Sequence, residues 1–213
     1  MLRLLITELK HHVPFTVLGA VTGLVFVIII ALTDALPVVS GASETVFDIL
    51  HPLHVVLSAA TTAAIYRKHS EGRILPTILI GYFGSIGIAT LSDSVFPFLA
   101  ESLLNLPHAE PHIGFIEMWW LVNPAAFLGI AIAIWKPLTR FPHTGHVFLS
   151  TWASLFHIIM AMGATIEWIL VLPIFAFLFL AVWVPCCLSD IAFPMFFSKE
   201  GMHSEEHRYD HQH

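Results

Sequence analysis

The stretch HPLHVVLS at residues 51–58 recurs as HTGHVFLS at residues 143–150, with both histidines, one valine, the leucine and the serine preserved. A second pair follows in the same order, because LSDSVFP at residues 91–97 recurs as LSDIAFP at residues 188–194. A weaker third match aligns Pro14, Leu18 and Gly19 with Pro124, Leu128 and Gly129. Three matches in register indicate an internal duplication.

The composition is typical of a membrane protein. Of the 213 residues, 57% are hydrophobic and 11% are charged, whereas soluble domains keep about a quarter of their residues charged. Apolar stretches that could span a bilayer, which takes about 20 residues each, fall at 13–36, 46–66, 74–99, 118–138, 145–163 and 167–190. We therefore predict an all-α integral membrane protein with six transmembrane helices.

The duplication divides these spans into two repeats of three helices. Repeat 1 covers about 10–105 and repeat 2 about 115–197, within one membrane domain at 1–200 that is followed by a His-rich tail at 198–213. An odd number of spans in each repeat turns the second copy upside down in the bilayer. Inverted-topology repeats of this kind are typical of transporters, whose binding sites lie where the repeats meet.

The basic residues predict the orientation. All nine Lys and Arg lie before the first span, between the second and third, between the fourth and fifth, or after the sixth. The segments 37–45, 100–117 and 162–167 contain none and are expected to be loops on the other side. The positive-inside rule then places both termini and the tail in the cytoplasm, in the plasma or inner membrane of the cell.

Ionisable side chains inside a bilayer are costly and usually have a function or a partner. We expect an outer half-site of His51, His54 and Asp93, and an inner half-site of His143, His146 and Asp190, with His157 near the middle. Imidazole and carboxylate ligands suit divalent transition metals such as zinc, manganese or iron. Further candidates share these depths and chemistries: Asp48, Ser58, Glu101, Glu117, Ser150, Glu167 and the adjacent Cys186 and Cys187.

The pattern predicts a transporter for a divalent transition-metal cation, most simply zinc, coupled to protons through titration of the histidines or carboxylates. Three alternatives stay open: an intramembrane zinc-dependent hydrolase, which needs all ligands at one depth, a haem protein with two axial histidines, and a channel or permease for a small solute. The expected partners are the lipid bilayer and the metal ion, and copies of the chain could form a homo-oligomer. No nucleotide-binding motif is present, and the scattered basic residues do not predict nucleic-acid binding.

Overall fold

The computed structural model describes residues 2–70, 73–136, 140–163, 167–187 and 193–197. Within these ranges every regular element is a helix, as the composition predicts. The elements are α1 (Leu2–Leu32), α2 (Leu36–His69), α3 (Ile74–Thr90), the π-helical turn η1 (Leu91–Val95), α4 (Phe96–Leu103), α5 (Gly114–Glu117), α6 (Trp119–Trp135), α7 (Arg140–Met162), α8 (Trp168–Cys187) and α9 (Phe193–Phe196).

Several helices are long and apolar enough to cross a membrane. Among the described residues these are the five segments Val13–Leu32, Leu36–Lys68, Ile74–Leu103, Gly145–Met162 and Trp168–Cys186. The remaining predicted span, the fourth at 118–138, corresponds to α6, an apolar helix of 17 residues, whose length is about 25 Å at 1.5 Å per residue. The chain is therefore a helical membrane protein.

The connection between α1 and α2 is much shorter than predicted. Helix α1 ends in a tight turn at Asp34, whose φ is 54°, a left-handed conformation that Asp adopts more readily than most residues. Pro37 lies in the first turn of α2, where its missing N–H costs nothing. The loop predicted at 37–45 is therefore wrong, because these residues form the first turns of α2.

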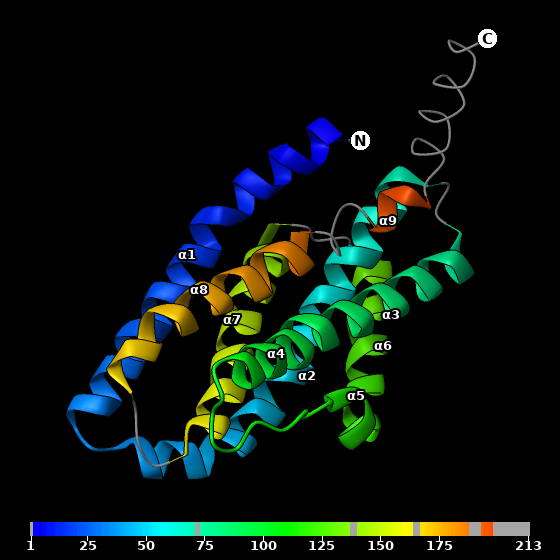
Figure 1. The fold of residues 1–213 in the computed structure, drawn as a ribbon. Coiled ribbons are helices and arrows are strands. Elements are labelled where there is room, and N and C mark those ends of the chain that lie inside the picture. The colour runs from blue at the N-terminus through cyan, green and yellow to red at the C-terminus, as the bar shows by residue number, and fades with distance from the viewer. Residues whose placement is uncertain (1, 71–72, 137–139, 164–166, 188–192, 198–213) are drawn as a thin grey trace.

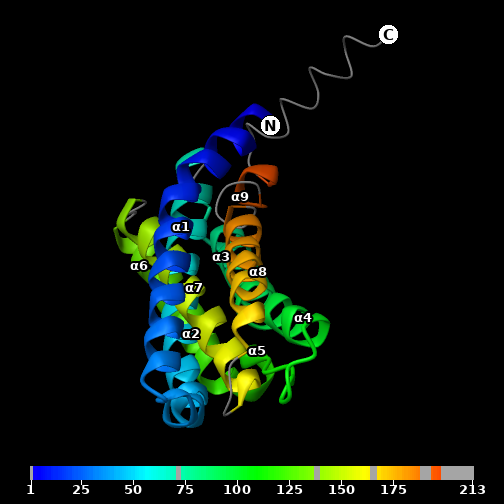
Figure 2. The ribbon, with the colours of Figure 1, turned by 60° about the vertical axis from the view of Figure 1, so that its left-hand side comes forward.

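Helices α2 and α7 form the centre of the bundle and pack closely against each other. Helix α2 also contacts α6 and α3, while α7 contacts α1 and α8. The outer helices pair as α1 with α8 and α3 with α6, and in Figure 1 these two pairs flank the central helices. The same end of the bundle holds the start of α1 and α9, while the α1–α2 turn and α5 lie at the opposite end (Figures 1 and 2).

Small residues bring the central helices into contact with their neighbours. A Cβ atom at Gly129 would lie 2.2 Å from the carbonyl oxygen of Val56, so α6 approaches the backbone of α2 directly. A Cβ atom at Gly19 would lie 2.9 Å from Oγ1 of Thr151, which brings α1 close to α7. Such close approach lets helices associate in a bilayer, where no hydrophobic effect drives them together.

The third span is interrupted by the π-helical turn η1. Pro97 has no N–H to donate to the carbonyl of Asp93 four residues earlier, and its ring would clash with that carbonyl in a regular α-helix. The backbone opens instead, so that the N–H of Phe96 bonds the carbonyl of Leu91. Turns of this kind are frequent at functional sites, and here the turn contains Ser92 and Asp93, both fully buried.

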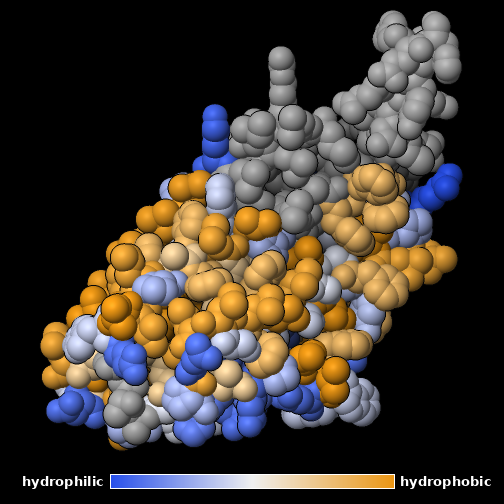
Figure 3. Space-filling model, in the orientation of Figure 1, coloured by the Kyte–Doolittle hydropathy of each residue, from blue (hydrophilic) through white to orange (hydrophobic). Residues whose placement is uncertain are grey.

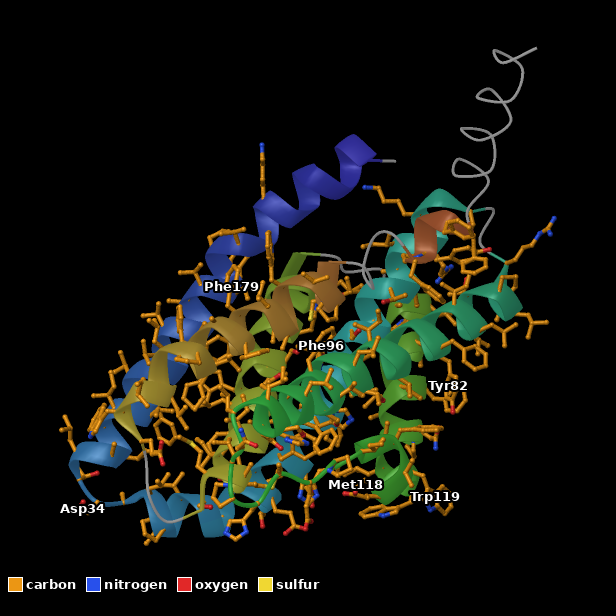
Figure 4. All side chains as sticks on the ribbon, viewed as in Figure 1. Asp34, Tyr82, Phe96, Met118, Trp119 and Phe179 are labelled. Atoms are coloured by element: carbon orange, nitrogen blue, oxygen red, sulfur yellow. The ribbon has the colours of Figure 1, made fainter. Side chains whose placement is uncertain are left out.

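The surface agrees with a membrane environment. In Figure 3 the middle of the visible face is mostly apolar, and hydrophilic side chains gather at its lower end. Figure 4 shows Asp34, Met118 and Trp119 at this lower end of the bundle. Trp119 and Trp120 are each 62% exposed, and Trp is enriched where membrane proteins meet the bilayer–water interface.

Candidate functional site

Asp93 is the centre of a buried polar cluster. Its Oδ2 accepts from Nδ1 of His51 at 2.9 Å and from Nδ1 of His54 at 2.7 Å. Its Oδ1 accepts from the hydroxyls of Ser92 and Ser150, each at 2.7 Å. All five residues are at most 1% exposed. A carboxylate can only accept hydrogen bonds, so both histidines carry their proton on Nδ1.

The two histidines reach Asp93 because they lie one turn apart on the same face of α2. The sequence predicts that they lie near the outer end of their span. Since α2 begins at Leu36 and ends at His69, His54 lies near the middle of this helix. The two histidines thus lie further from the start of their helix than the sequence predicts, because α2 begins earlier. Their depth in the bilayer stays a prediction.

Helix α7 brings residues of the second repeat to the same cluster. The ring of His146 stacks on that of His54, with centroids 5.8 Å apart and an angle of 15° between the planes. Ser150, one turn further along α7, reaches Asp93, and the hydroxyl of Ser154 donates to the carbonyl of Ser92 at 2.9 Å. The prediction of two separate half-sites is therefore wrong for His54 and His146, which lie in one cluster.

The second ring nitrogen of each imidazole is not used in hydrogen bonding within the described part of the chain. Nε2 of His51 and Nε2 of His54 are buried and have no hydrogen-bond partner among the described residues. The ion pairs of Asp93 in the described part of the chain are with these two histidines only, and no Lys or Arg balances its charge. A buried charge is costly unless it is paired, so this cluster favours the binding of a cation or a proton at Nε2.

A second buried pair lies between α4 and α7. Nδ1 of His157 donates to Oε1 of Glu101 at 2.6 Å, and the two side chains are 1% and 0% exposed. Phe47 separates this pair from Asp93 and its partners, since its ring stacks on His51 at 5.3 Å and meets the edge of His157 at 5.4 Å. The structure thus places His157 near the cluster and not in it.

The other predicted site residues whose side chains the structure describes lie outside the cluster. Asp48 is half-buried on α2, Ser58 is buried further along this helix, Glu117 is 49% exposed beside His112, and Glu167 is exposed before α8. Cys186 packs with Val147 and Val182. The side chains of His143 and Cys187, Asp190 and the tail at 198–213 lie outside what the structure describes.

The imidazoles and carboxylates do not yet form a closed coordination shell. In the described ranges, no three His, Cys, Asp or Glu side chains are already gathered closely enough to hold a metal ion. Binding by the cluster therefore requires the open Nε2 atoms to turn toward one another.

Three contributors to the site are not singled out by the sequence. Phe47 and Ser154 each lie one helical turn from a predicted site residue, and that spacing is the only signal that could have found them. Gly114 packs over His51, and a Cβ atom there would lie 2.7 Å from Nε2 of His51. A glycine that contacts a distant histidine has no signature in sequence.

Comparison with protein-family models, with curated proteins and with solved structures gives no match for this chain.

Proposed function

We propose that the protein is a multi-pass membrane transporter for divalent transition-metal cations. The observation that carries this proposal is the pairing of Asp93 with Nδ1 of both His51 and His54. Their buried Nε2 atoms have no hydrogen-bond partner among the residues that the structure describes. Histidines that bind metals usually donate their other ring N–H to a carboxylate or a carbonyl, which orients the ring and raises its basicity. Asp93 would do this for two histidines at once.

Contacts of the central helices support two inverted repeats. The sequence alignment pairs Gly19 with Gly129 and Ser58 with Ser150, so Ala59 pairs with Thr151. The position of Gly19 contacts Thr151, and the position of Gly129 contacts Ala59. Exchange of the two halves therefore converts one contact into the other. The helix pairs follow the same rule, since α2–α6 exchanges with α7–α1, α2–α3 with α7–α8, and α1–α8 with α6–α3.

The stacked pair of His54 and His146 supports a central site. These two residues are equivalent in the alignment, and their rings are in contact. Residues related by a twofold axis can touch only close to that axis. For inverted repeats the axis lies in the plane of the membrane, and transporters of this architecture bind their substrates where the repeats meet, near the bilayer midplane.

Two more features support the transport reading and its orientation. The π-helical turn that carries Ser92 and Asp93 is a break in a membrane-spanning segment, and discontinuous helices commonly form transporter binding sites.

At one end of the bundle, Arg67 of α2 donates to the carbonyls of Ala133 and Ile134 at the end of α6. Basic residues at this end would face the cytoplasm under the positive-inside rule, which agrees with cytoplasmic termini and a plasma or inner membrane location.

Proton coupling follows from the same atoms. Nε2 of His51 and Nε2 of His54 would bind either a metal cation or a proton, but not both. Protonation would therefore release the metal, and metal binding would release protons. Imidazole nitrogen suits zinc and iron better than the hard cations calcium and magnesium.

An intramembrane zinc-dependent hydrolase is the second candidate, because histidines, a carboxylate and serines of both repeats lie in one cluster. One observation opposes it. Among the described residues, the Ser150 hydroxyl bonds Asp93 and lies 3.1 Å from Ser92 Oγ, with no bond to a histidine. A nucleophilic serine is typically activated by an adjacent histidine that takes its proton. We therefore favour transport.

The test uses the full chain in liposomes that contain a zinc-sensitive dye. We expect zinc uptake to increase with an opposing proton gradient. His54→Ala or His146→Ala should abolish uptake and remove zinc binding at the Asp93 cluster. The matched control is His108→Ala, at a histidine beside Gly163 and outside the cluster. The transport proposal fails if the wild type binds no transition metal, or if it binds zinc and hydrolyses lipid or ester substrates without moving the metal.

A further inference from the structure

The buried pair of Glu101 and His157 repeats the chemistry of Asp93 and its histidines. In both places a carboxylate accepts from Nδ1 of an imidazole, while Nε2 has no partner among the described residues. Oε2 of Glu101 is also buried without a hydrogen-bond partner there. As at Asp93, no Lys or Arg pairs with Glu101 in the described part of the chain. Fully buried polar atoms that have no hydrogen-bond partner in the described part of the chain, as these two have, are costly unless a ligand uses them.

A histidine connects this pair to the surface. The ring of His112 lies 5.6 Å from that of His157, at an angle of 70°. His112 is 27% exposed, and its Nδ1 lies 3.5 Å from Oε2 of Glu117, which is 49% exposed. Asp48 is close enough to interact electrostatically with both His112 and Glu117. Imidazole and carboxylate groups therefore extend from the exposed end of the bundle toward the buried pair.

The charge at this end favours cations. The sequence contains no Lys or Arg at all from 11 to 66 or from 74 to 135, the ranges that supply α2 up to Tyr66, the third span, α5 and α6. Glu44, Asp48 and Glu117 are half-buried or exposed near this end. Glu44, Asp48 and Glu117 thus form an acidic surface without a neighbouring basic residue in these sequence ranges. Such a surface raises the local concentration of cations.

Phe47 lies between the buried pair and the Asp93 cluster. It is 1% exposed, its ring stacks on that of His51, and the ring of His157 lies 5.4 Å away at an angle of 81°. A cation that moves from His157 to His51 would have to displace this phenyl ring. A bulky apolar side chain between two sets of ligands acts as a barrier between them.

We propose that Glu101, His157 and His112 form a second binding station for a divalent transition-metal cation, reached from the α5 end of the bundle and separated from the Asp93 cluster by Phe47. The proposal rests on the proposed transport function and adds a site to it. Glu101 and His157 supply buried ligands, and the His112 ring turns inward to complete the set. The cation then passes Phe47 to reach His51 and His54.

The test is a cobalt titration of the full chain in nanodiscs, followed by visible absorption, together with zinc uptake in liposomes. We expect two equivalents of cobalt for the wild type, one for Glu101→Gln and one for Asp93→Asn. Uptake should persist in Glu101→Gln with the KM for zinc raised about tenfold or more, the size of effect typical when a group that supports metal binding is lost. Glu167→Gln, at an exposed glutamate before α8, is the matched control and should change neither readout.

The outcomes separate this proposal from the transport proposal. If Glu101→Gln keeps wild-type stoichiometry and KM while Asp93→Asn loses binding and uptake, the second station is refuted and transport stands. A single equivalent in the wild type, lost in both variants, also refutes a distinct station. If cobalt does not bind to the wild type, the transport proposal itself fails. If Glu101→Gln does not fold, His112→Gln replaces it, because this position is partly exposed. The same loss of one cobalt equivalent and the same rise in the KM for zinc are expected.

Discussion

Replacing Asp93 by asparagine tests whether its carboxylate sets the protonation of His51 and His54. The asparagine oxygen can still accept from Ser92 and Ser150, but its amide group now faces the Nδ1 atoms of the two rings. An amide nitrogen donates two hydrogen bonds and accepts none. Each ring must therefore accept at Nδ1 and carry its proton on Nε2, which removes the lone pairs that a cation would use.

The expected magnitudes differ between binding and stability. Asparagine keeps four hydrogen bonds where aspartate has four, so the free energy of unfolding should change by only about 1 kcal/mol. Cobalt or zinc affinity should fall by about 10–100-fold or more, because the ligand atoms are now protonated. Asp93→Ala leaves four buried donors without acceptors, at about 1 kcal/mol or more each, and should cost about 4 kcal/mol.

Three measurements on the purified protein in detergent separate these effects. Cobalt titration gives the affinity, and nitrogen NMR of labelled histidine reports which ring nitrogen carries the proton. Unfolding in a denaturing detergent gives the stability. The control is Asp34→Asn, the same chemical change in the exposed α1–α2 turn, where the φ of 54° also suits asparagine.

Two results would refute this reasoning. If Asp93→Asn binds cobalt as tightly as the wild type, the carboxylate does not prepare the histidines for a cation. If the wild-type rings already carry their protons on Nε2, the inferred hydrogen-bond directions are wrong. A third result would change the interpretation of Asp93. If Asp93→Asn and Asp93→Ala lower the free energy of unfolding equally, Asp93 has a structural role only.

Further predictions concern the packing that holds the site. Gly129→Ala should destabilise the protein by about 1–3 kcal/mol, because the new Cβ would press on the backbone of α2, whereas Gly87→Ala meets nothing within 4 Å and should be neutral or slightly stabilising in detergent unfolding. Arg67→Met removes the donor to the last carbonyls of α6 and should cost about 1–2 kcal/mol, seen as a lower Tm. Tyr82→Phe removes the hydrogen bond to Asn123 and should cost about 1 kcal/mol in the same assay, while zinc affinity stays unchanged.

The lengths and composition of the apolar stretches predicted the class of fold and most of the helices. They could not locate the start of α2. Residues 37–45 contain serine, glycine and glutamate and lie outside the apolar run, yet they are helical because Asp34 makes a two-helix turn and Pro37 begins the next helix. That difference moved His51 and His54 from the end of a span to the middle of a helix.

The sequence by itself determined which groups are available: two matching HxxH motifs, a Ser-Asp pair in each half and membrane-spanning helices to carry them. Only the tertiary structure decided that Asp93 bonds His51, His54 and Ser150, and that His54 meets His146. The physical reason is that helical periodicity fixes which side chains share a face of one helix, as it does for the two histidines of α2. Contacts across α2, η1 and α7 depend instead on how closely the helices approach, which small residues, a proline-induced π-helical turn and the full packing determine together.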